Sequence, residues 1–353
     1  MTEQPVGSTA TATRPLLALD FDLRHPADLA ATGPGTYGAA LDIIGWADEI
    51  GFERVAFGEH HQSPDGYLPC PLVFAAAAGS RTQRMRIRIS ILLALLYDPL
   101  RLAEEVAVAD LCARGRLDLA LGVGYVEDDF VAFGKDYHRR GRNIEQLLAF
   151  LRRAWTGEPF EYNGTTVRVT PRPFQDPMPI YLGGGAARRS IQRAAELADG
   201  FFPPGMQRPW EAYRKACTAL GKPDPGEWAP RGPIFLWVTT KDKDETWARL
   251  APHIRHQIDS YGQWTKAGLG TATGPYIPTN DTESLRQGGA YQVVTPDEAI
   301  ELAAQLGPAG ELHLNPLLAG IDPQDAWTML RTFEREVLPH IGVRERGALP
   351  SGS

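Results

Sequence analysis

The chain has 353 residues, of which 43% are hydrophobic and 22% charged, and it contains 36 glycines and 29 prolines. This composition excludes a disordered or collagen-like chain, and the length suits two average domains or one large α/β barrel. A net charge of -7 argues against nucleic acid or an anionic membrane as the main partner. Cys70, Cys112 and Cys217 form no CxxC pair, which is typical of reduced thiols in a cytoplasmic protein.

Short apolar runs rich in β-forming residues alternate along the chain with amphipathic stretches. Eight runs separated by helical patterns predict a TIM (β/α)8 barrel, and the absence of GxGxxG after the first run argues against a doubly wound sheet. The expected strands, in chain order, are Pro15–Phe21, Arg54–Phe57, Ile87–Leu93, Leu117–Val123, Ile180–Leu182, Gly200–Phe202, Ile234–Thr239 and Glu311–Leu314.

Helix signals support the same alternation. Apolar residues recur at helical spacing over Ile144–Trp155, and Thr295-Pro296-Asp297-Glu298 forms a capping box with proline at the first helical position. Asp322-Pro323 begins the last helix in the same way. Gly115 and Gly307 suit helix ends that need a left-handed residue.

Two segments depart from the simple repeat. Phe160–Pro173 predicts a β-hairpin that turns at Asn163-Gly164. Gln257–Gly289 is rich in Gly, Thr and Pro and predicts a long insertion near the C-terminal end of the barrel, where such segments shape or cover a pocket. We therefore expect one domain over residues 15–342, insertion 257–289 included, between flexible tails at 1–14 and 343–353. The longest apolar run is too short to span a membrane.

In a parallel barrel the chemistry lies where the strands end. The second strand is followed by Gly58-Glu59-His60-His61. These histidines suit metal ligands, a general acid or base, hydrogen-bond donors, or residues that satisfy loop backbone groups. Metal is the weaker interpretation, because neighbouring residues on extended chain point apart, and we expect no metal site.

Glycine-rich turns form the second candidate feature. Gly183-Gly184-Gly185 lies between a strand and the helix Ala186–Leu197, where free amides and the helix dipole favour a phosphate; a tight turn that only needs glycine is an equal alternative. Arg188 and Arg189 in the first helical turn favour an anionic ligand.

Two further segments offer weaker signals. Gly122-Val123-Gly124-Tyr125 ends the fourth strand and permits the close approach of a flat ligand, or only a bend. The run Asp136–Arg142 has enough donors to bind a carboxylate or phosphate, although a solvated helix start is the simpler interpretation.

In their joint order these segments resemble the bacterial luciferase-like flavin monooxygenases and oxidoreductases. The resemblance extends from about Leu16 to Ile341 and implies a luciferase-like TIM barrel that binds a flavin or deazaflavin at its C-terminal mouth. The segments that carry it are Gly58–His61, Asp98–Glu105, Gly115–Leu119, Gly122–Tyr125, Phe130–Gly134, and Tyr181–Gly185 with Asp199–Phe201.

The resemblance also implies roles for single residues. His60 matches the catalytic histidine beside the flavin, with Glu59 its acidic neighbour, and Ser90-Ile91 matches a peptide bond, usually cis, that bulges against the isoalloxazine ring. Val123 stands where luciferase has an arginine that helps to hold the phosphate, which leaves the glycine turn with Arg188, Arg189 or Arg139. The residues expected to bind the cofactor are Ser90, Ile91, Gly122, Gly124, Tyr137, Arg139, Gly183, Gly184, Gly185 and Ala186.

The leading hypothesis is a two-component monooxygenase that takes reduced FMN from a separate flavin reductase and oxidises a small organic substrate with molecular oxygen. The lack of an NAD-binding fingerprint fits this reading. His60 would donate a hydrogen bond or a proton, and the insertion would cover the site. We also expect a homodimer, as is common for the family.

Other functions stay open on the same fold. One alternative is a deazaflavin (coenzyme F420)-dependent oxidoreductase that transfers hydride, in which His60 serves as acid or base to the substrate. A second alternative is a non-catalytic flavin-binding protein. A metal-dependent hydrolase comes last, because no second His-x-His or carboxylate cluster accompanies His60 and His61.

Overall fold

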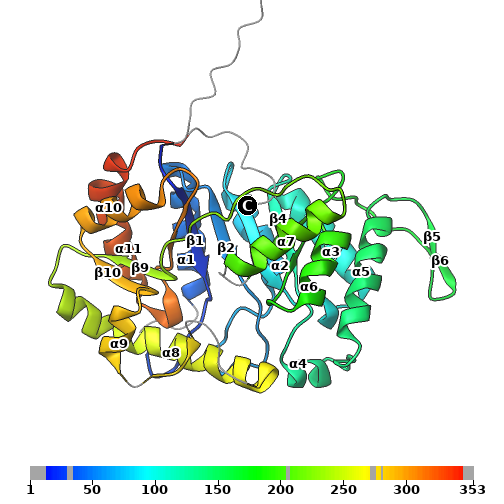
Figure 1. Ribbon diagram of the computed structural model, residues 1–353, viewed down its shortest axis with the longest axis horizontal. Coiled ribbons are helices and arrows are strands. Elements are labelled where there is room, and N and C mark those ends of the chain that lie inside the picture. The colour runs from blue at the N-terminus through cyan, green and yellow to red at the C-terminus, as the bar shows by residue number, and fades with distance from the viewer. Residues whose placement is uncertain (1–12, 30–34, 204–206, 271–275, 280, 345–353) are drawn as a thin grey trace, which may run out of the picture.

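The computed structural model describes residues 13–29, 35–203, 207–270, 276–279 and 281–344 (Figure 1). Its main feature is a curled sheet of seven parallel strands in the order β11-β1-β2-β3-β4-β7-β8. These strands are β1 (Leu16–Phe21), β2 (Arg54–Phe57), β3 (Arg86–Leu92), β4 (Leu117–Leu121), β7 (Ile180–Gly183), β8 (Gly200–Phe202) and β11 (Glu311–Leu314).

A second parallel pair, β9 (Phe235–Val238) and β10 (Tyr291–Val294), forms a separate two-stranded sheet. One bridge between Arg231 and Glu311 joins the segment before β9 to β11. All eight expected strands are present within a few residues of their expected ends. Strand β10 is additional, and the sequence analysis missed it because this four-residue run lies between a glycine pair and the capping box of the next helix.

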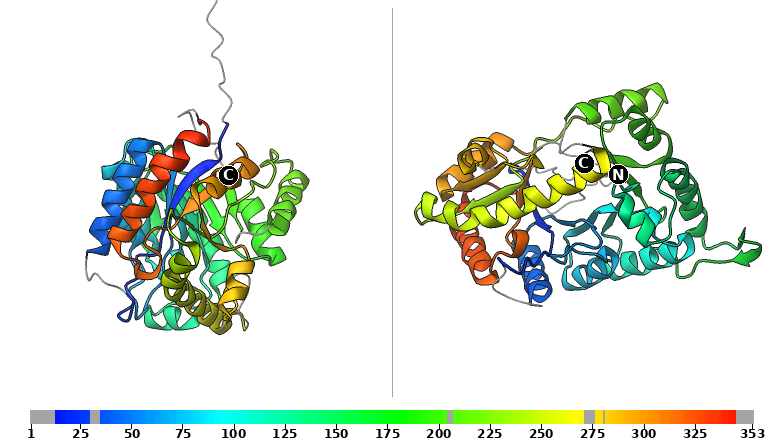
Figure 2. Two further views of the ribbon diagram at one scale, coloured as in Figure 1. Left: turned by 90° about the vertical axis from the view of Figure 1, so that its left-hand side faces the viewer. Right: turned by 90° about the horizontal axis from the view of Figure 1, so that it is seen from below.

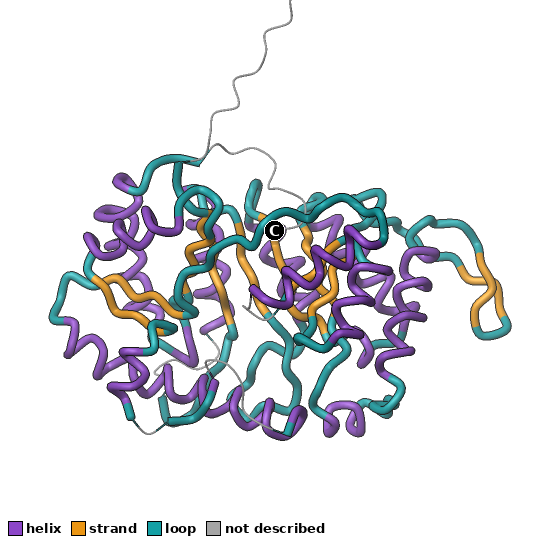
Figure 3. The backbone as a smooth tube through the Cα atoms, viewed as in Figure 1, coloured by secondary structure: helices purple, strands orange, loops and turns teal. Residues whose placement is uncertain are grey.

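Helices cover the outer face of the curled sheet, so that strands and helices form an inner and an outer layer (Figures 1 and 3). Helix α6 begins at the glycine turn and α8 is much the longest in the described part of the chain. The helices are α1 (Thr36–Ile50), α2 (Pro71–Arg81), α3 (Pro99–Cys112), α4 (Glu127–Ala132), α5 (Arg140–Ala154), α6 (Arg188–Leu197), α7 (Gln207–Ala219), α8 (Lys243–Leu269), α9 (Thr282–Gln287), α10 (Pro296–Leu306) and α11 (Pro323–Thr332).

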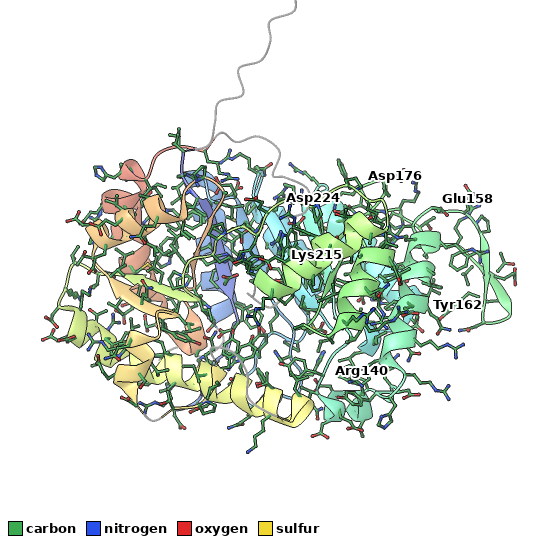
Figure 4. The ribbon with its side chains drawn as sticks, in the orientation of Figure 1. Arg140, Glu158, Tyr162, Asp176, Lys215 and Asp224 are labelled. Atoms are coloured by element: carbon green, nitrogen blue, oxygen red, sulfur yellow. The ribbon has the colours of Figure 1, made fainter. Side chains whose placement is uncertain are left out.

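Local signals in the sequence account for several boundaries. The capping box is confirmed, because the Thr295 side chain accepts from the Glu298 amide and the Glu298 carboxylate accepts from the Thr295 amide. The hairpin is confirmed as β5 (Phe160–Tyr162) and β6 (Thr165–Val167), with Asn163 and Gly164 both at positive φ. It projects from the side of the barrel, where Glu158 and Tyr162 mark it in Figure 4.

The expected insertion is more ordered than its composition suggests. Helix α8 continues through Leu269, so the first part of Gln257–Gly289 is helical, and α9 occupies its end. Residues 271–275 and 280 of this insertion lie outside the described residues, as do 1–12 and 345–353 of the two expected tails. The described tail residues are held, because Thr13 pairs with Val343 and the Arg14 guanidinium binds Glu53 at 2.7 Å.

The two faces of the strands differ in chemistry. Outward residues such as Leu17, Val55 and Ile87 pack against the helices in one core. Inward positions hold charged side chains, namely Asp20, Arg54, Arg88, Asp118, Glu311 and His313. The lumen is therefore filled by ion pairs where barrels of this kind usually carry branched aliphatic residues. No helix in the described part of the chain is long and apolar enough to cross a membrane.

Candidate active site

The mouth of the barrel lies at the edge where the parallel strands end. In Figure 1 this is the lower edge, and the view from below in Figure 2 shows α8, drawn in yellow, running across it. The helix packs closely enough that a Cβ atom at Gly268 would overlap the Tyr125 carbonyl group. Helix α8 thus roofs the part of the mouth in which His60 lies.

His60 leaves the end of β2 and is almost enclosed. Its backbone amide donates to the Leu68 carbonyl at 3.3 Å, and its ring stacks on Trp264 of α8 with centroids 3.8 Å apart. The rings of Tyr67 and Tyr261 meet it edge-on at 4.8 and 5.5 Å. Burial, and then the charge of Arg24, lower the pKa of His60 to about 3. The imidazole is therefore neutral at physiological pH, able to donate from one nitrogen and accept at the other.

Arg24 lies beneath the same aromatic group and was not found by the sequence analysis. Its side chain is fully buried, with the guanidinium carbon 4.8 to 5.1 Å from the ring centroids of Tyr67, Tyr261 and Trp264. Asp22 and Asp65 balance its charge at 3.6 and 3.4 Å. Cation–π contacts of this kind hold α8 against the loop after β1.

Glu59 is buried and turned toward the segment after β3. Its carboxylate accepts from the Leu93 amide at 2.6 Å and from the Tyr97 hydroxyl at 2.9 Å, and it lies 2.9 Å from His61 Nε2. These contacts fix the loop that follows β3. The catalytic role expected for Glu59 beside His60 stays a prediction.

The peptide bond between Ser90 and Ile91 is cis, as the resemblance implies, and the register between β3 and β4 shifts there. The Ile91 side chain lies against two of the glycines expected to bind cofactor. A Cβ atom at Gly183 would overlap Ile91 Cδ1, and one at Gly122 would overlap Ile91 Cγ2. Both glycines therefore have a packing reason that the sequence could not show.

The glycine turn after β7 is open to an anion. Gly185 and Ala186 are exposed, a Cβ atom at Gly185 would meet nothing within 4 Å, and the N-cap residue of α6, Ala187, makes no side-chain cap. Free amides at a helix start of this length suit a phosphate. Gly184 lies beside this turn, its amide donating to the Phe202 carbonyl at 3.3 Å.

The arginines expected near the phosphate differ in availability. Arg189 is paired with Glu145 at 2.9 Å, and Arg139 with Asp136 at 3.4 Å. Arg188 is exposed and makes no ion pair with the described residues. It is thus the one of the three that is free to meet an anion at the turn.

Tyr137 and Gly124 lie on the α4–α5 side of the mouth. The Tyr137 hydroxyl donates to the Tyr125 carbonyl at 3.3 Å, and the Arg140 guanidinium covers the Tyr137 ring at 3.8 Å; Figure 4 labels Arg140 at this lower edge. Gly124 has φ +72° and packs against Phe130, which gives it a structural reason, and its expected role in cofactor binding stays a prediction.

These parts together fit a flavin or deazaflavin. Ser90 and Ile91, which the resemblance places against the ring system, lie beside Gly122 and Gly183, and the uncapped turn at Gly185 and Ala186 offers amides for a phosphate. Whether the cofactor-binding residues act as expected stays a prediction.

A second set of residues escaped the sequence analysis because its members are far apart in the chain. Asp20 Oδ2 lies 2.7 Å from His313 Nδ1, and His313 Nε2 lies 3.1 Å from Glu311 Oε2. Burial alone would lower the pKa of His313, but Asp20 and Glu311 outweigh it and raise that pKa to about 9. The lumen thus holds an imidazolium between two carboxylates.

Comparison with protein families agrees with this fold and site. Residues 21–312 match the family described as luciferase-like monooxygenase. Because the match spans most of the chain, the protein belongs to this family, and its fold is the luciferase-like TIM barrel that the sequence predicted.

Curated relatives are distant. An uncharacterized protein of Mycobacterium tuberculosis is 29% identical over 137 residues, 37% of this chain and 49% of its own. The first relatives are thus matched over about half of their length. An F420-dependent glucose-6-phosphate dehydrogenase of Microbacterium testaceum is 26% identical over 86% of this chain and 93% of its own. The oxygenase component of a flavin-dependent trigonelline monooxygenase of Acinetobacter baylyi is 25% identical over 40% of this chain and 41% of its own.

Solved structures share the fold. A monooxygenase of Streptomyces bottropensis has a TM-score of 0.69 at 23% identity, covering 92% of this chain and 99% of its own. The oxygenating constituent of 3,6-diketocamphane monooxygenase of Pseudomonas putida, solved with FMN, has 0.67 at 19%, covering 94% and 100%. An F420-dependent secondary alcohol dehydrogenase has 0.66 at 16%, covering 93% and 100%. The relatives and structural neighbours thus include flavin-dependent and F420-dependent enzymes, and the likeness to the solved structures shows that this chain shares their fold.

Proposed function

We propose that the protein is a flavin-dependent monooxygenase that uses reduced FMN from a separate flavin reductase, and molecular oxygen, to oxidise a small organic substrate. The observation that carries this proposal is the enclosure of His60. A neutral imidazole lies under a roof of aromatic side chains, and only 8% of the residue is exposed. An enclosure of this kind keeps water away from reactive oxygen chemistry.

The residues of the chain divide the work. Ser90 and Ile91 support the ring and the amides at Gly185 and Ala186 hold the phosphate. When bound, reduced FMN supplies the electrons that activate oxygen. His60 donates or accepts a hydrogen bond at the reacting group, because its neutral ring has one donor and one acceptor nitrogen. Tyr67, Tyr261 and Trp264 exclude water.

Parallel titrations of the purified protein with FMN, reduced FMN and F420 test this proposal. We expect a preference for reduced FMN, with oxygen uptake when substrate and a reductase are present. His60→Ala should lower turnover far more than reduced-FMN affinity, because His60 faces the reacting group. Equal loss of binding and turnover would contradict that role.

The F420-dependent alternative is favoured by one finding. The F420-dependent dehydrogenase relative matches 86% of this chain, whereas the trigonelline monooxygenase component matches 40%. In this reading F420 takes or gives hydride, and His60 is acid or base to the substrate. Tight F420 binding without response to FMN, and no oxygen uptake, would replace the monooxygenase proposal with this one. Tight binding of oxidised flavin without turnover would support a flavin-binding protein instead.

The proposal also concerns the cellular setting of the protein and its oligomeric state. Three widely spaced free cysteines support a cytoplasmic setting, in which a flavin reductase would be the functional partner. We also propose a homodimer, which sedimentation of the purified protein would test.

A further inference from the structure

The lumen contains two acceptor atoms without donors near its C-terminal end. Of the two oxygens of Asp20, the structure gives only Oδ2 a hydrogen-bond partner among the described residues, His313. Asn315 follows β11, is 5% exposed, and its Oδ1 has no partner among them. A buried acceptor without a donor costs free energy, so the Asn315 oxygen points to a missing ligand group, and Asp20 Oδ1, which is not buried, adds a charged acceptor with a free position.

These two residues lie side by side. The parallel register of β1 and β11 pairs Ala18 with His313 and ends at Leu19 and Leu314, so Asp20 and Asn315 come next on the two segments. Asp20 shares the inward phase of Ala18, and its partner His313 shares that of Glu311. Asp20 therefore faces the lumen, and Asn315 continues the His313 phase just past the end of β11.

Asp20 differs from the other carboxylates of the lumen. The side chains of Asp118 and Glu311 are 5% and 3% exposed, and each contacts at least two basic groups. Asp20 has one basic partner and is 33% exposed. Because the outer face of β1 packs in the helix core, this exposure is toward the lumen. A carboxylate with a purely structural role would be buried and paired with several basic groups, as Asp118 and Glu311 are.

The space that Asp20 faces is the one beneath α8. Asp20 lies at the C-terminal end of β1, two residues before Asp22, which pairs with Arg24 beneath the rings of α8. Burial chiefly raises the pKa of Tyr276 well above its usual range, and the charge of Asp20 adds to that rise. Tyr276 stacks on Tyr261 at 4.5 Å, and Tyr261 meets His60 at 5.5 Å. Asp20 and His60 thus lie at the same mouth of the barrel, because the neighbouring strands β1 and β2 end there.

We propose that Asp20 and Asn315 form an acceptor pair that binds an N–H or O–H group of the ligand beneath α8. His313 is a positioning residue, since it holds Asp20 in place through Nδ1 and is held by Glu311 through Nε2. The proposal rests on the proposed function in that the ligand is the cofactor or substrate of this oxidoreductase. The donor comes either from the N3–H edge of the flavin ring or from a hydroxyl or amino group of the substrate.

Matched probes separate the two sources. The first pair is FMN and 3-methyl-FMN, which lacks the N3–H; the second is a set of phenols and their methyl ethers, of which 4-hydroxybenzaldehyde and 4-methoxybenzaldehyde are one pair. Equilibrium binding is followed by flavin and tryptophan fluorescence and by ligand-observed NMR. In one of the pairs we expect the donor-bearing member to bind wild-type protein about tenfold or more tightly, as for a hydrogen bond to a charged acceptor.

Variants connect the preference to the pair. Asp20→Asn and Asn315→Ala should bring the ratio of affinities within that probe pair close to one, and His313→Gln should reduce it in part. Asp42→Asn, which removes an exposed carboxylate on α1, should leave the ratio unchanged. The ratio on wild-type protein needs no variant, so a variant that fails to fold does not decide the outcome.

Each result has one meaning. A ratio near one for both probe pairs on wild-type protein, no binding of any donor-bearing probe at millimolar concentration, or a ratio that survives Asp20→Asn overturns the acceptor pair. A clear phenol preference in a chain that binds neither FMN nor F420 would support the pair and overturn the proposed function. Flavin binding in which neither probe pair shows a preference for the donor-bearing member would overturn the acceptor pair and leave the proposed function standing.

Discussion

The two sides of the mouth are built differently. On the barrel side, specific backbone hydrogen bonds and close contacts set each group: Glu59 holds the Leu93 amide, and Gly122 and Gly183 leave room only for Ile91. On the α8 side, Trp264 and Tyr261 touch His60 and Arg24 through ring faces and edges. The barrel side therefore fixes the positions of its groups. The α8 side can adjust to a ligand beneath it, because stacked rings tolerate sliding better than directional hydrogen bonds do.

The largest effect on cofactor binding and stability should come from a side chain added at Gly183, in the space that Ile91 occupies. Gly183→Ala places a Cβ atom on Ile91 Cδ1, so the bulge must move. We expect weaker FMN binding, about a hundredfold slower turnover, the scale of a misplacement of about 1 Å, and about 1–3 kcal/mol lower stability from overpacking. Titration calorimetry, turnover assays and urea unfolding measure these effects.

Gly185→Ala is the matched control for this change. A Cβ atom there meets nothing within 4 Å, so FMN affinity and stability should stay close to wild type. Equal damage from both alanines would show that the turn, rather than the space around Ile91, decides binding.

Glu59→Gln should weaken the hydrogen bonds that hold the loop after β3 on the barrel side. The amide can no longer accept from the Leu93 amide, the Tyr97 hydroxyl and His61 as the carboxylate does. We expect a loss of about 1–3 kcal/mol in the free energy of unfolding, with a smaller effect on FMN binding than that of Gly183→Ala. Unchanged stability with lost turnover would instead give Glu59 the catalytic role that the sequence suggested.

Trp264→Ala removes a ring from the α8 side of the mouth. It should change the protonation of His60 more than the position of its side chain. Burial holds the pKa of His60 near 3, below its ordinary 6.5, so the closed arrangement loses stability as pH falls through this window. Removal of the indole should raise that pKa toward the ordinary value and flatten the loss. Histidine NMR titration and unfolding between about pH 7 and 4 measure it. An unchanged His60 titration would mean that Trp264 does not bury it.

The smallest effect should be that of Arg188→Ala. One exposed cation at a helix start contributes about 0.3–1 kcal/mol to anion binding, so FMN should bind only two- to fivefold more weakly and riboflavin as before. Arg189→Ala, which removes an arginine already paired with Glu145, should have less effect still. The same loss for riboflavin would exclude contact with the phosphate.

The sequence predicted the barrel, the hairpin, the capping box and the cis bond, because these depend on local patterns or on motifs a few residues long. It also brought His60 and the glycine turn to one mouth, since parallel strands end at one edge. The number of predicted strands was one too few, because the four-residue run of β10 directly follows the glycine-rich insertion and is too short to show a period.

Other parts of the site depend on contacts between distant residues. Arg24 meets Trp264, and Asp20 meets His313, across more than half of the chain. Neither pair has a spacing that a single sequence reveals. Gly122 and Gly183 were visible, but their reason was not, because only the fold places Ile91 between them. Local patterns thus located the mouth, whereas its charges and its roof needed the tertiary structure.

The separate β9–β10 pair has a consequence for what the barrel can admit. Across the described residues, no ladder joins this pair to β8, and one bridge at Arg231 and Glu311 joins its beginning to β11. A displacement of the β9–α8–β10 segment would therefore break side-chain packing and few backbone hydrogen bonds. The barrel is therefore weakly joined on both sides of the β9–β10 pair. A bulky ligand can be accommodated by an outward movement of the β9–α8–β10 segment, without the unfolding of a strand.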